Sequence, residues 1–175
     1  MKKKLTLERD NLDRKIISRK ISEIHEDNDE TDELGRQYVQ DNESIDRLIQ
    51  MTKDSKLTRE DKEEQLESLN KTKRILLERY KEKVDERKKE NNEELKDLID
   101  KVEDVKQEAE EQKNEMDKMK METGEVSLDD NLKKQEELIK WLDKIKTDES
   151  EELKRSQEVT AALRRQMERN KGRML

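Results

Sequence analysis

The chain has 175 residues, of which 51% are Asp, Glu, Lys or Arg, while 27% are hydrophobic and 2% are aromatic. Average globular domains are nearly half apolar, so this composition excludes a thick closed core and leaves either disorder or helices packed along narrow apolar seams. The net charge of −7 is uneven, because residues 1–20 carry +5 and residues 151–175 carry +3, which leaves −15 on the segment between them.

The residue types favour helices over disorder. Proline is absent, there are only three glycines, and Glu, Lys and Leu, which favour helices, are abundant. We therefore predict an all-α fold, an elongated antiparallel helical hairpin or three-helix coiled-coil rod.

The first predicted element is a basic N-terminal helix over residues 1–54. Its two apolar clusters are separated by His25–Glu33, HEDNDETDE, in which six of nine residues are acidic and none is apolar. The sequence leaves open a break near 26–35 that would end at Gly35.

A turn at 55–58 and a long central helix over 59–122 follow. Thr58 with Asp61 three residues later is typical of a helix N-terminal cap. Apolar residues then recur at steps of three and four, which is typical of a coiled coil. They form an early seam and a late one, for which we predict helix–helix contacts at Leu66, Leu69, Leu76, Tyr80, Leu95, Leu98, Val102, Val105, Met116 and Met119.

The early and late seams of this helix do not join. Stepping on from Leu66 reaches Glu94, one residue short of Leu95, and the intervening stretch 85–94 holds no apolar residue. We interpret 85–94 as a polar hinge that stays helical through propensity and weak surface ion pairs. It would be the softest part of the chain, and disorder there is the alternative.

The second turn, 123–127, precedes a C-terminal helix over 128–171. Gly124 suits a left-handed helix end, and Ser127 with Asp130 repeats the cap pattern. This helix has the most regular seam, with polar residues such as Gln135 and Glu149 at some of its positions. Its predicted contact residues are Leu128, Leu132, Ile139, Leu142, Leu153, Leu163 and Met167.

Two features of the C-terminal helix are candidate docking sites for a partner. Trp141 stands beside the seam, one residue before Leu142. The end of the chain, 163–175, forms a basic tail. The candidate partner contacts are Trp141, Arg164, Arg165, Arg169, Lys171 and Arg173.

Short turns between long helices favour antiparallel neighbours. Folding at the first turn would bring Ile17 level with Leu95, and folding at the second would bring Trp141 level with Ala109. All three helices would then overlap around residues 80–107. A parallel homodimer, with the turns as kinks, is the alternative that narrow seams leave open.

Little in the sequence indicates chemistry. There is one histidine, His25, no cysteine and no Gly-rich phosphate loop, so we expect no enzyme, no catalytic residue, no metal site and no cofactor. A calcium loop starting at Asp27 would need Gly and Glu where Asp32 and Tyr38 stand. The basic ends lack aromatic residues to stack on bases, which argues against nucleic acid.

We therefore expect a non-enzymatic structural or adaptor protein that acts through helix–helix contacts with itself, as a homo-oligomer, or with other coiled-coil proteins. The longest apolar runs are three residues, so we expect no membrane span and a cytoplasmic location, with signal-less export left open. The main alternative is a helical chaperone, stalk or co-exported companion of a secretion or assembly machine. A soluble subunit in membrane fusion or tethering is a third class.

Overall fold

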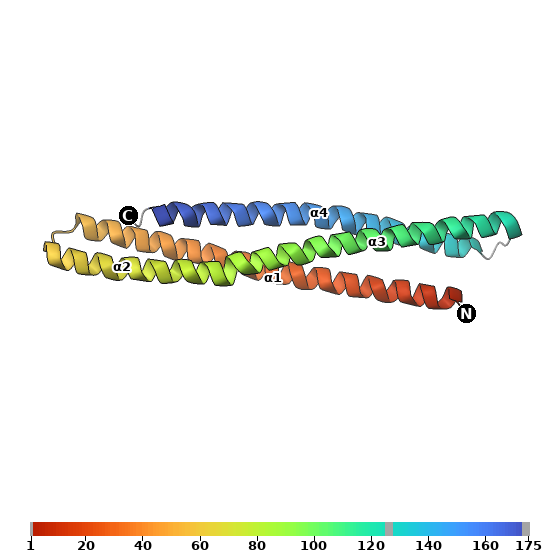
Figure 1. Cartoon of the computed structure of the whole chain (residues 1–175), viewed down its shortest axis with the longest axis horizontal. Helices are drawn as coiled ribbons and strands as arrows, with labels where there is room; N and C mark the ends of the chain where they lie inside the picture. Colours follow the sequence, from red (N-terminus) through yellow and green to blue (C-terminus); the bar gives the residue numbers. More distant parts are fainter. Residues whose placement is uncertain (1, 125–127, 173–175) are drawn as a thin grey trace. The chain divides into compact units, whose positions relative to one another are not determined.

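The computed structural model describes residues 2–124 and 128–172, with side chains for 14–124 and 128–169. It contains α1 (Lys2–Asp54), α2 (Arg59–Tyr80), the π-helical turn η1 (Lys81–Asp85), α3 (Glu86–Thr123) and α4 (Leu128–Gly172) (Figure 1). α2, η1 and α3 follow one another without a gap, so there are three long helices, and the described residues hold no strand. The predicted all-α class is confirmed.

Local hydrogen bonds mark a helix end at each of the two turns. At the start of α2, the Thr58 hydroxyl oxygen accepts a hydrogen bond from the Asp61 amide at 3.3 Å. At the end of α3, Gly124 has φ +61° and its amide donates to the Lys120 carbonyl at 2.8 Å, an arrangement that favours glycine. The predicted cap at Ser127 lies outside the described residues.

α1 runs through residues 26–35 without interruption, so the break that the acidic run suggested is absent. Two of its polar residues face inward, since Asn28 and Thr31 are buried. The Thr31 hydroxyl donates to the Asp27 carbonyl at 2.6 Å. The acidic run is therefore a half-buried part of α1 in which Thr31 has a hydrogen-bond partner within the helix.

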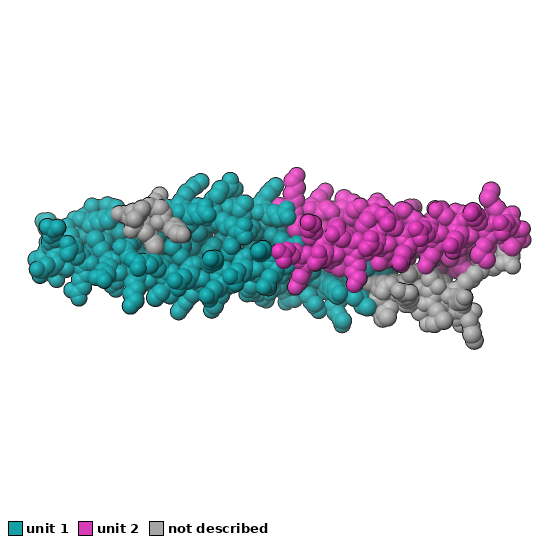
Figure 2. Space-filling model, viewed as in Figure 1, with its two compact units in different colours: residues 1–92, 156–175 teal, residues 93–155 magenta. Residues whose placement is uncertain are grey.

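The chain divides into two compact units, coloured in Figure 2: unit 1 comprises residues 1–92 and 156–175, and unit 2 comprises residues 93–155. In unit 1, Lys73 of α2 pairs with Asp46, while Lys88 of α3 contacts Asn28, so α1 runs antiparallel to α2–η1–α3. Ser156 of α4 also contacts Asn28. Further along, Leu163 lies against Gly35, so α4 runs parallel to α1.

One apolar cluster of unit 1 joins all three helix segments. Its buried members are Val39, Tyr80, Val84, Leu163 and Met167. The ring of Tyr38 meets that of Tyr80 edge-on, with centroids 6.4 Å apart. The segments thus pair within one chain.

Gly35 permits a close approach between α1 and its neighbours. A Cβ atom at this position would lie 2.9 Å from Leu163 Cδ1 and 3.2 Å from Val84 Cγ1. We expect Gly35→Leu to destabilise the protein by about 1–3 kcal/mol through overpacking, although leucine has the higher helix propensity.

Urea denaturation followed by circular dichroism measures the effect of Gly35→Leu. Arg36→Leu, at the exposed neighbouring position, controls for the added apolar side chain. Equal stability of the two variants would contradict the close approach.

Unit 2 is an antiparallel pair formed by 93–123 of α3 and 128–155 of α4. Ion pairs connect the two segments, including Lys106 with Asp143 at 2.9 Å and Lys146 with Glu103 at 2.7 Å. The Gln135 side-chain amide donates to the Ala109 carbonyl at 2.9 Å. The buried apolar residues of this unit are Leu95, Leu98, Val102, Ala109, Leu128, Leu132, Leu138 and Leu142.

The offset between the two seams of the central helix coincides with η1. Within η1, the Glu86 amide bonds to the carbonyl of Lys81, five residues back, so this turn holds one residue more than an α-turn. Buried positions continue through Val84, Lys88, Asn91 and Leu95. The one-residue discrepancy in the sequence is therefore a local change of helix type just before the polar stretch, and 86–94 is ordinary α-helix.

Candidate functional site

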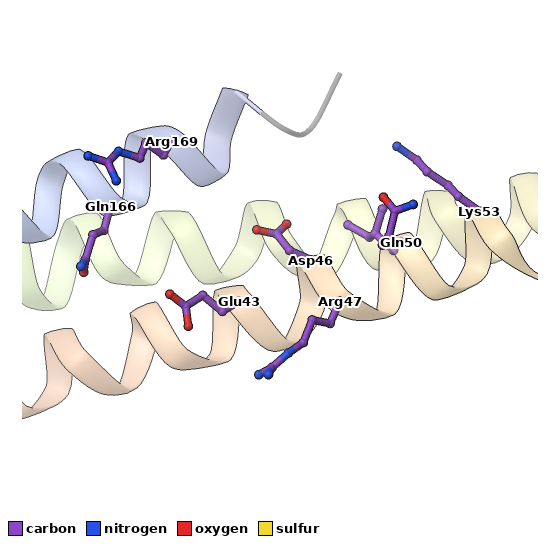
Figure 3. Close-up of a pocket in the computed structure, with 8 residues that line it drawn as sticks. Glu43, Asp46, Arg47, Gln50, Lys53, Gln166 and Arg169 are labelled. Carbon is purple, nitrogen blue, oxygen red and sulfur yellow. The ribbon is translucent and has the colours of Figure 1, made fainter.

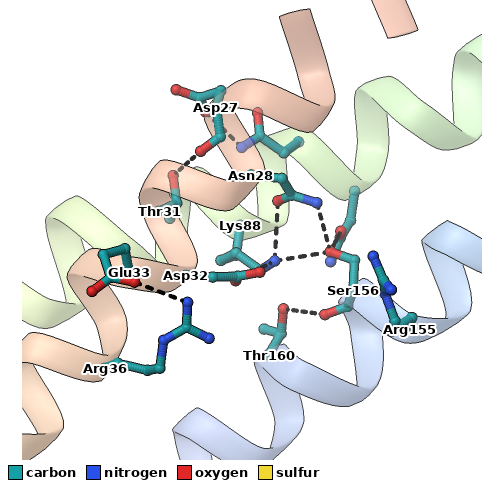
Figure 4. Close-up of polar contacts among 12 residues, drawn as sticks. Asp27, Asn28, Thr31, Asp32, Glu33, Arg36, Lys88, Arg155, Ser156 and Thr160 are labelled. Carbon is teal, nitrogen blue, oxygen red and sulfur yellow. Dashed lines mark hydrogen bonds and ion pairs between the residues drawn. The ribbon is translucent and has the colours of Figure 1, made fainter. Parts of the chain in front are cut away.

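Lys88 is the centre of a buried polar layer in unit 1, because its side chain is fully buried in the middle of the polar stretch. Its ammonium donates to Asn28 Oδ1 at 3.0 Å and to Ser156 Oγ at 2.9 Å (Figure 4). Asp32 Oδ1 lies 2.7 Å away and accepts no well-directed hydrogen bond, so this contact is an ion pair. The ammonium thus has two hydrogen-bond acceptors and one carboxylate oxygen beside it.

The Ser156 hydroxyl of this layer is fully hydrogen-bonded. Ser156 Oγ accepts from Lys88 and from Asn28 Nδ2, the latter at 2.9 Å, and donates to Asn92 Oδ1 at 2.6 Å. A hydroxyl group has two acceptor positions and one donor, and all three are used. We call Asn28, Asp32, Lys88 and Ser156 the Lys88 layer.

A second set of contacts lies beside the Lys88 layer. Asp27 of α1 accepts from Arg87 and, at 2.6 Å, from the side-chain amide of Asn91. The acidic run of α1 and the polar stretch of α3 therefore face each other. The interpretation of 85–94 as a polar hinge did not include the inward-facing side chains of this stretch, because Lys88 and Asn91 occupy buried seam positions.

A second buried lysine lies nearer the α1–α2 turn. Lys73 of α2 is fully buried and forms an ion pair and hydrogen bond with Asp46 of α1. Asn42, one helical turn before Asp46, is also fully buried, and neither polar atom of its amide has a hydrogen-bond partner. We call Asn42, Asp46 and Lys73 the Lys73 layer.

A groove of about 700 Å³ lies near the Lys73 layer, between α1 and the last turns of α4 (Figure 3). Charged and amide side chains line most of it, among them Glu43, Arg47, Lys53 and Arg169, with Ile49 as the apolar member. Both charge signs are mixed along the groove, so its lining favours water over an apolar ligand.

Arg164 occupies a different environment from the rest of the basic end. It donates a hydrogen bond to Asp85, and that bond raises the pKa of Arg164. Arg165 and Arg169 are exposed, whereas the side chain of Lys171 and the whole of Arg173 lie outside the described residues. α4 remains helical to Gly172, and Leu163 and Met167 are buried, so the predicted basic tail begins as a helix that packs through these two residues.

Trp141, a candidate partner contact, is half-buried. The predicted helix–helix contact residues fall into three groups by exposure. The buried ones are Tyr80, Leu95, Leu98, Val102, Leu128, Leu132, Leu142, Leu163 and Met167. The half-buried ones are Leu66, Leu69, Leu76, Val105, Met116, Ile139 and Leu153. Met119 is exposed, and the next residue, Lys120, pairs with Asp129 of α4.

Sequence reasoning did not identify Lys73 and Lys88 as interior residues. A signal for Lys88 was present, because steps of four, three and four from Val84 reach Lys88, Asn91 and Leu95. The early seam also includes position 73. Polar residues at these positions, flanked by apolar seam residues, are the pattern that indicates a buried polar layer.

Tyr80 is the titratable group with the clearest consequence for pH. Its pKa is raised to about 12, chiefly by burial and also by the Asp85 carboxylate, while Arg164 opposes the shift. Unfolded tyrosine ionises near pH 10, so the folded state favours the neutral phenol. This contribution to stability is complete below about pH 10 and is lost as the pH rises toward 12.

An absorbance titration at 295 nm of Tyr38→Phe, which leaves Tyr80 as the single tyrosine, tests this shift. Circular dichroism recorded in parallel shows over which pH range the helices persist. Ionisation near pH 10 with the helices intact would contradict the burial of the phenol.

The described residues contain no group of three or more His, Asp or Glu side chains placed to hold a metal ion. Within 2–124 and 128–172, no helix carries an apolar stretch long enough to cross a bilayer. No protein-family model, curated protein or solved structure is similar to the chain.

Proposed function

We propose that this chain is a non-enzymatic structural or adaptor protein that acts through helix–helix contacts with itself or with partner proteins. The observation that carries the proposal is the apolar surface left exposed at helix ends. At the end of α1, Leu48 and Met51 are 49% and 67% exposed, and Leu57 follows in the turn at 40%. At the end of α3, Met121 is 90% exposed. Flexible methionine side chains suit contacts with other surfaces.

The buried polar groups support the non-enzymatic part of the proposal. The Lys88 ammonium directs its hydrogens to side chains of α1 and α4. A general base or nucleophile needs a lone pair directed at a substrate. Lys88 is instead used to connect helices, as are the ion pairs between α3 and α4.

Sedimentation equilibrium over a hundredfold concentration range tests self-association. We expect a mass above that of the 21.1-kDa monomer that rises with concentration. Replacing Leu48 and Met51 together by glutamate should weaken the association at least tenfold. Replacing Glu67 and Lys71, which are exposed and polar, by Gln should leave it unchanged.

A constant monomer mass would mean that the chain does not self-associate. Contacts with other proteins are then tested. A photo-crosslinking amino acid is then placed at Met51, at Met121 or, as the matched control, at Glu67. The proposal requires a discrete adduct at Met51 or Met121 that is missing at Glu67. A monomer without such adducts would contradict it. We also propose a cytoplasmic location, which fractionation of cells that express the protein tests.

A further inference from the structure

The two buried lysine layers share an Asn–Asp pair on α1 and an ion pair between its aspartate and a lysine, although Asn42, unlike Asn28, has no hydrogen-bond partner. In the Lys88 layer, Asn28 and Asp32 stand one helical turn apart on α1 and both contact the lysine. In the Lys73 layer, Asn42 and Asp46 stand at the same spacing, and Asp46 pairs with Lys73. Both lysines are fully buried.

The spacing between the two layers differs between the helices. On α1 the second Asn–Asp pair follows the first by 14 residues, which is two heptads. On the opposite helix, Lys88 follows Lys73 by 15 residues. Two antiparallel helices with regular heptads could not bring both lysines to their partners, because one extra residue turns a side chain by about 100° around its helix.

The extra residue lies within η1, which stands between the two lysines. Its backbone bond runs from the Glu86 amide to the Lys81 carbonyl, so the turn holds five residues where an α-turn holds four. Lys81, Glu82 and Lys83 are exposed within it, whereas Val84 is fully buried. η1 thus accommodates one additional residue on its exposed side. After that residue, the side chain of Val84 again points into the interface.

We propose that η1 is a one-residue insert between two duplicated register locks, and that the Lys73 and Lys88 layers together hold α1 and the α2–α3 helix in a single register. The insert lets both layers close at once. The π-helical turn is then a consequence of the two layers and not of the local sequence of 81–85.

Deletion of Glu82 distinguishes this proposal from the alternative that the local sequence of 81–85 itself favours the π turn. The deletion restores regular heptads, because Val84, Lys88, Asn91 and Leu95 then follow Tyr80 at steps of three, four, three and four. Every buried side chain keeps its place on an unbroken α-helix. We expect the thermal midpoint to stay within about 5 °C of the parent.

Deletion of Lys89, an exposed residue of the same helix, is the matched control. If η1 persists, Asn91 and every later seam residue rotate out of the interface. If η1 converts to an α-turn, Val84 and Lys88 rotate out. In either case the thermal midpoint should fall by more than about 10 °C.

A second measurement tests whether both locks remain closed in the Glu82 deletion. Lys73→Met and Lys88→Met are each introduced into the parent and into the deletion variant. Each substitution should lower the thermal midpoint by the same amount, within about 2 °C, in both backgrounds. Failure of the Glu82 deletion to fold, equal losses in the two deletions, or a lysine whose replacement no longer matters after the deletion would each overturn the proposal.

Discussion

Lys88→Met is expected to lower the free energy of unfolding by about 3–5 kcal/mol, because it breaks a buried, paired charge. Methionine fills nearly the same volume as lysine but offers no donor. Asp32 would lose its counter-charge, and Asn28 Oδ1 and Ser156 Oγ would each lose a hydrogen bond. Urea denaturation followed by circular dichroism measures the change.

Lys89→Met is the matched control for this substitution. Lys89 is exposed on the next position of the same helix, so the same chemical change there should alter stability by no more than about 0.5 kcal/mol. If the two variants unfold at the same urea concentration, the Lys88 layer makes no contribution and its burial is contradicted.

Replacement of the whole Lys88 layer should have a different effect from loss of the lysine alone. Asn28→Leu, Asp32→Asn, Lys88→Leu and Ser156→Ala together make the three buried positions of the layer apolar and leave no charge in it. Such replacements are often neutral or stabilising, so we expect most of the loss to be recovered. If it is recovered, the polar layer specifies register and its contribution to net stability is small.

Leu142→Ala is expected to cost about 2–5 kcal/mol. Leu142 is fully buried in unit 2, where two facing helix segments supply a narrow row of apolar residues. With few neighbouring side chains able to move into the cavity, the cost should fall in the upper part of that range. Trp141, the single tryptophan, stands next to it and reports the transition of unit 2 through its fluorescence.

Ile75→Ala truncates an aliphatic side chain of the same size at an exposed position. Ile75 is 43% exposed, so its truncation should cost less than about 1 kcal/mol. Equal costs for Ile75→Ala and Leu142→Ala would contradict the burial of Leu142. Circular dichroism recorded in parallel with fluorescence shows whether the helices of the whole chain melt in the same transition.

Local sequence was enough to predict the helices and their ends. Proline-free, Glu- and Lys-rich segments form the three long helices, and Thr58 and Gly124 stand at the ends that they were predicted to cap. The regular spacing from Leu128 to Met167 coincides with the buried side of α4. The one-residue offset before Leu95 was also visible, although its form, a π-helical turn, was not.

The tertiary structure alone showed how the buried polar residues are compensated. A charged side chain is usually exposed, so residue type assigns a lysine among ten polar residues to solvent, and the seam spacing that points inward at Lys88 does not name its partners. Its burial is tolerated because Asn28 and Ser156, which lie 60 and 68 residues away along the chain, supply the oxygens that replace water. Helix propensity is determined within a few residues of each position, whereas compensation of a buried charge requires all three helix segments to be in register.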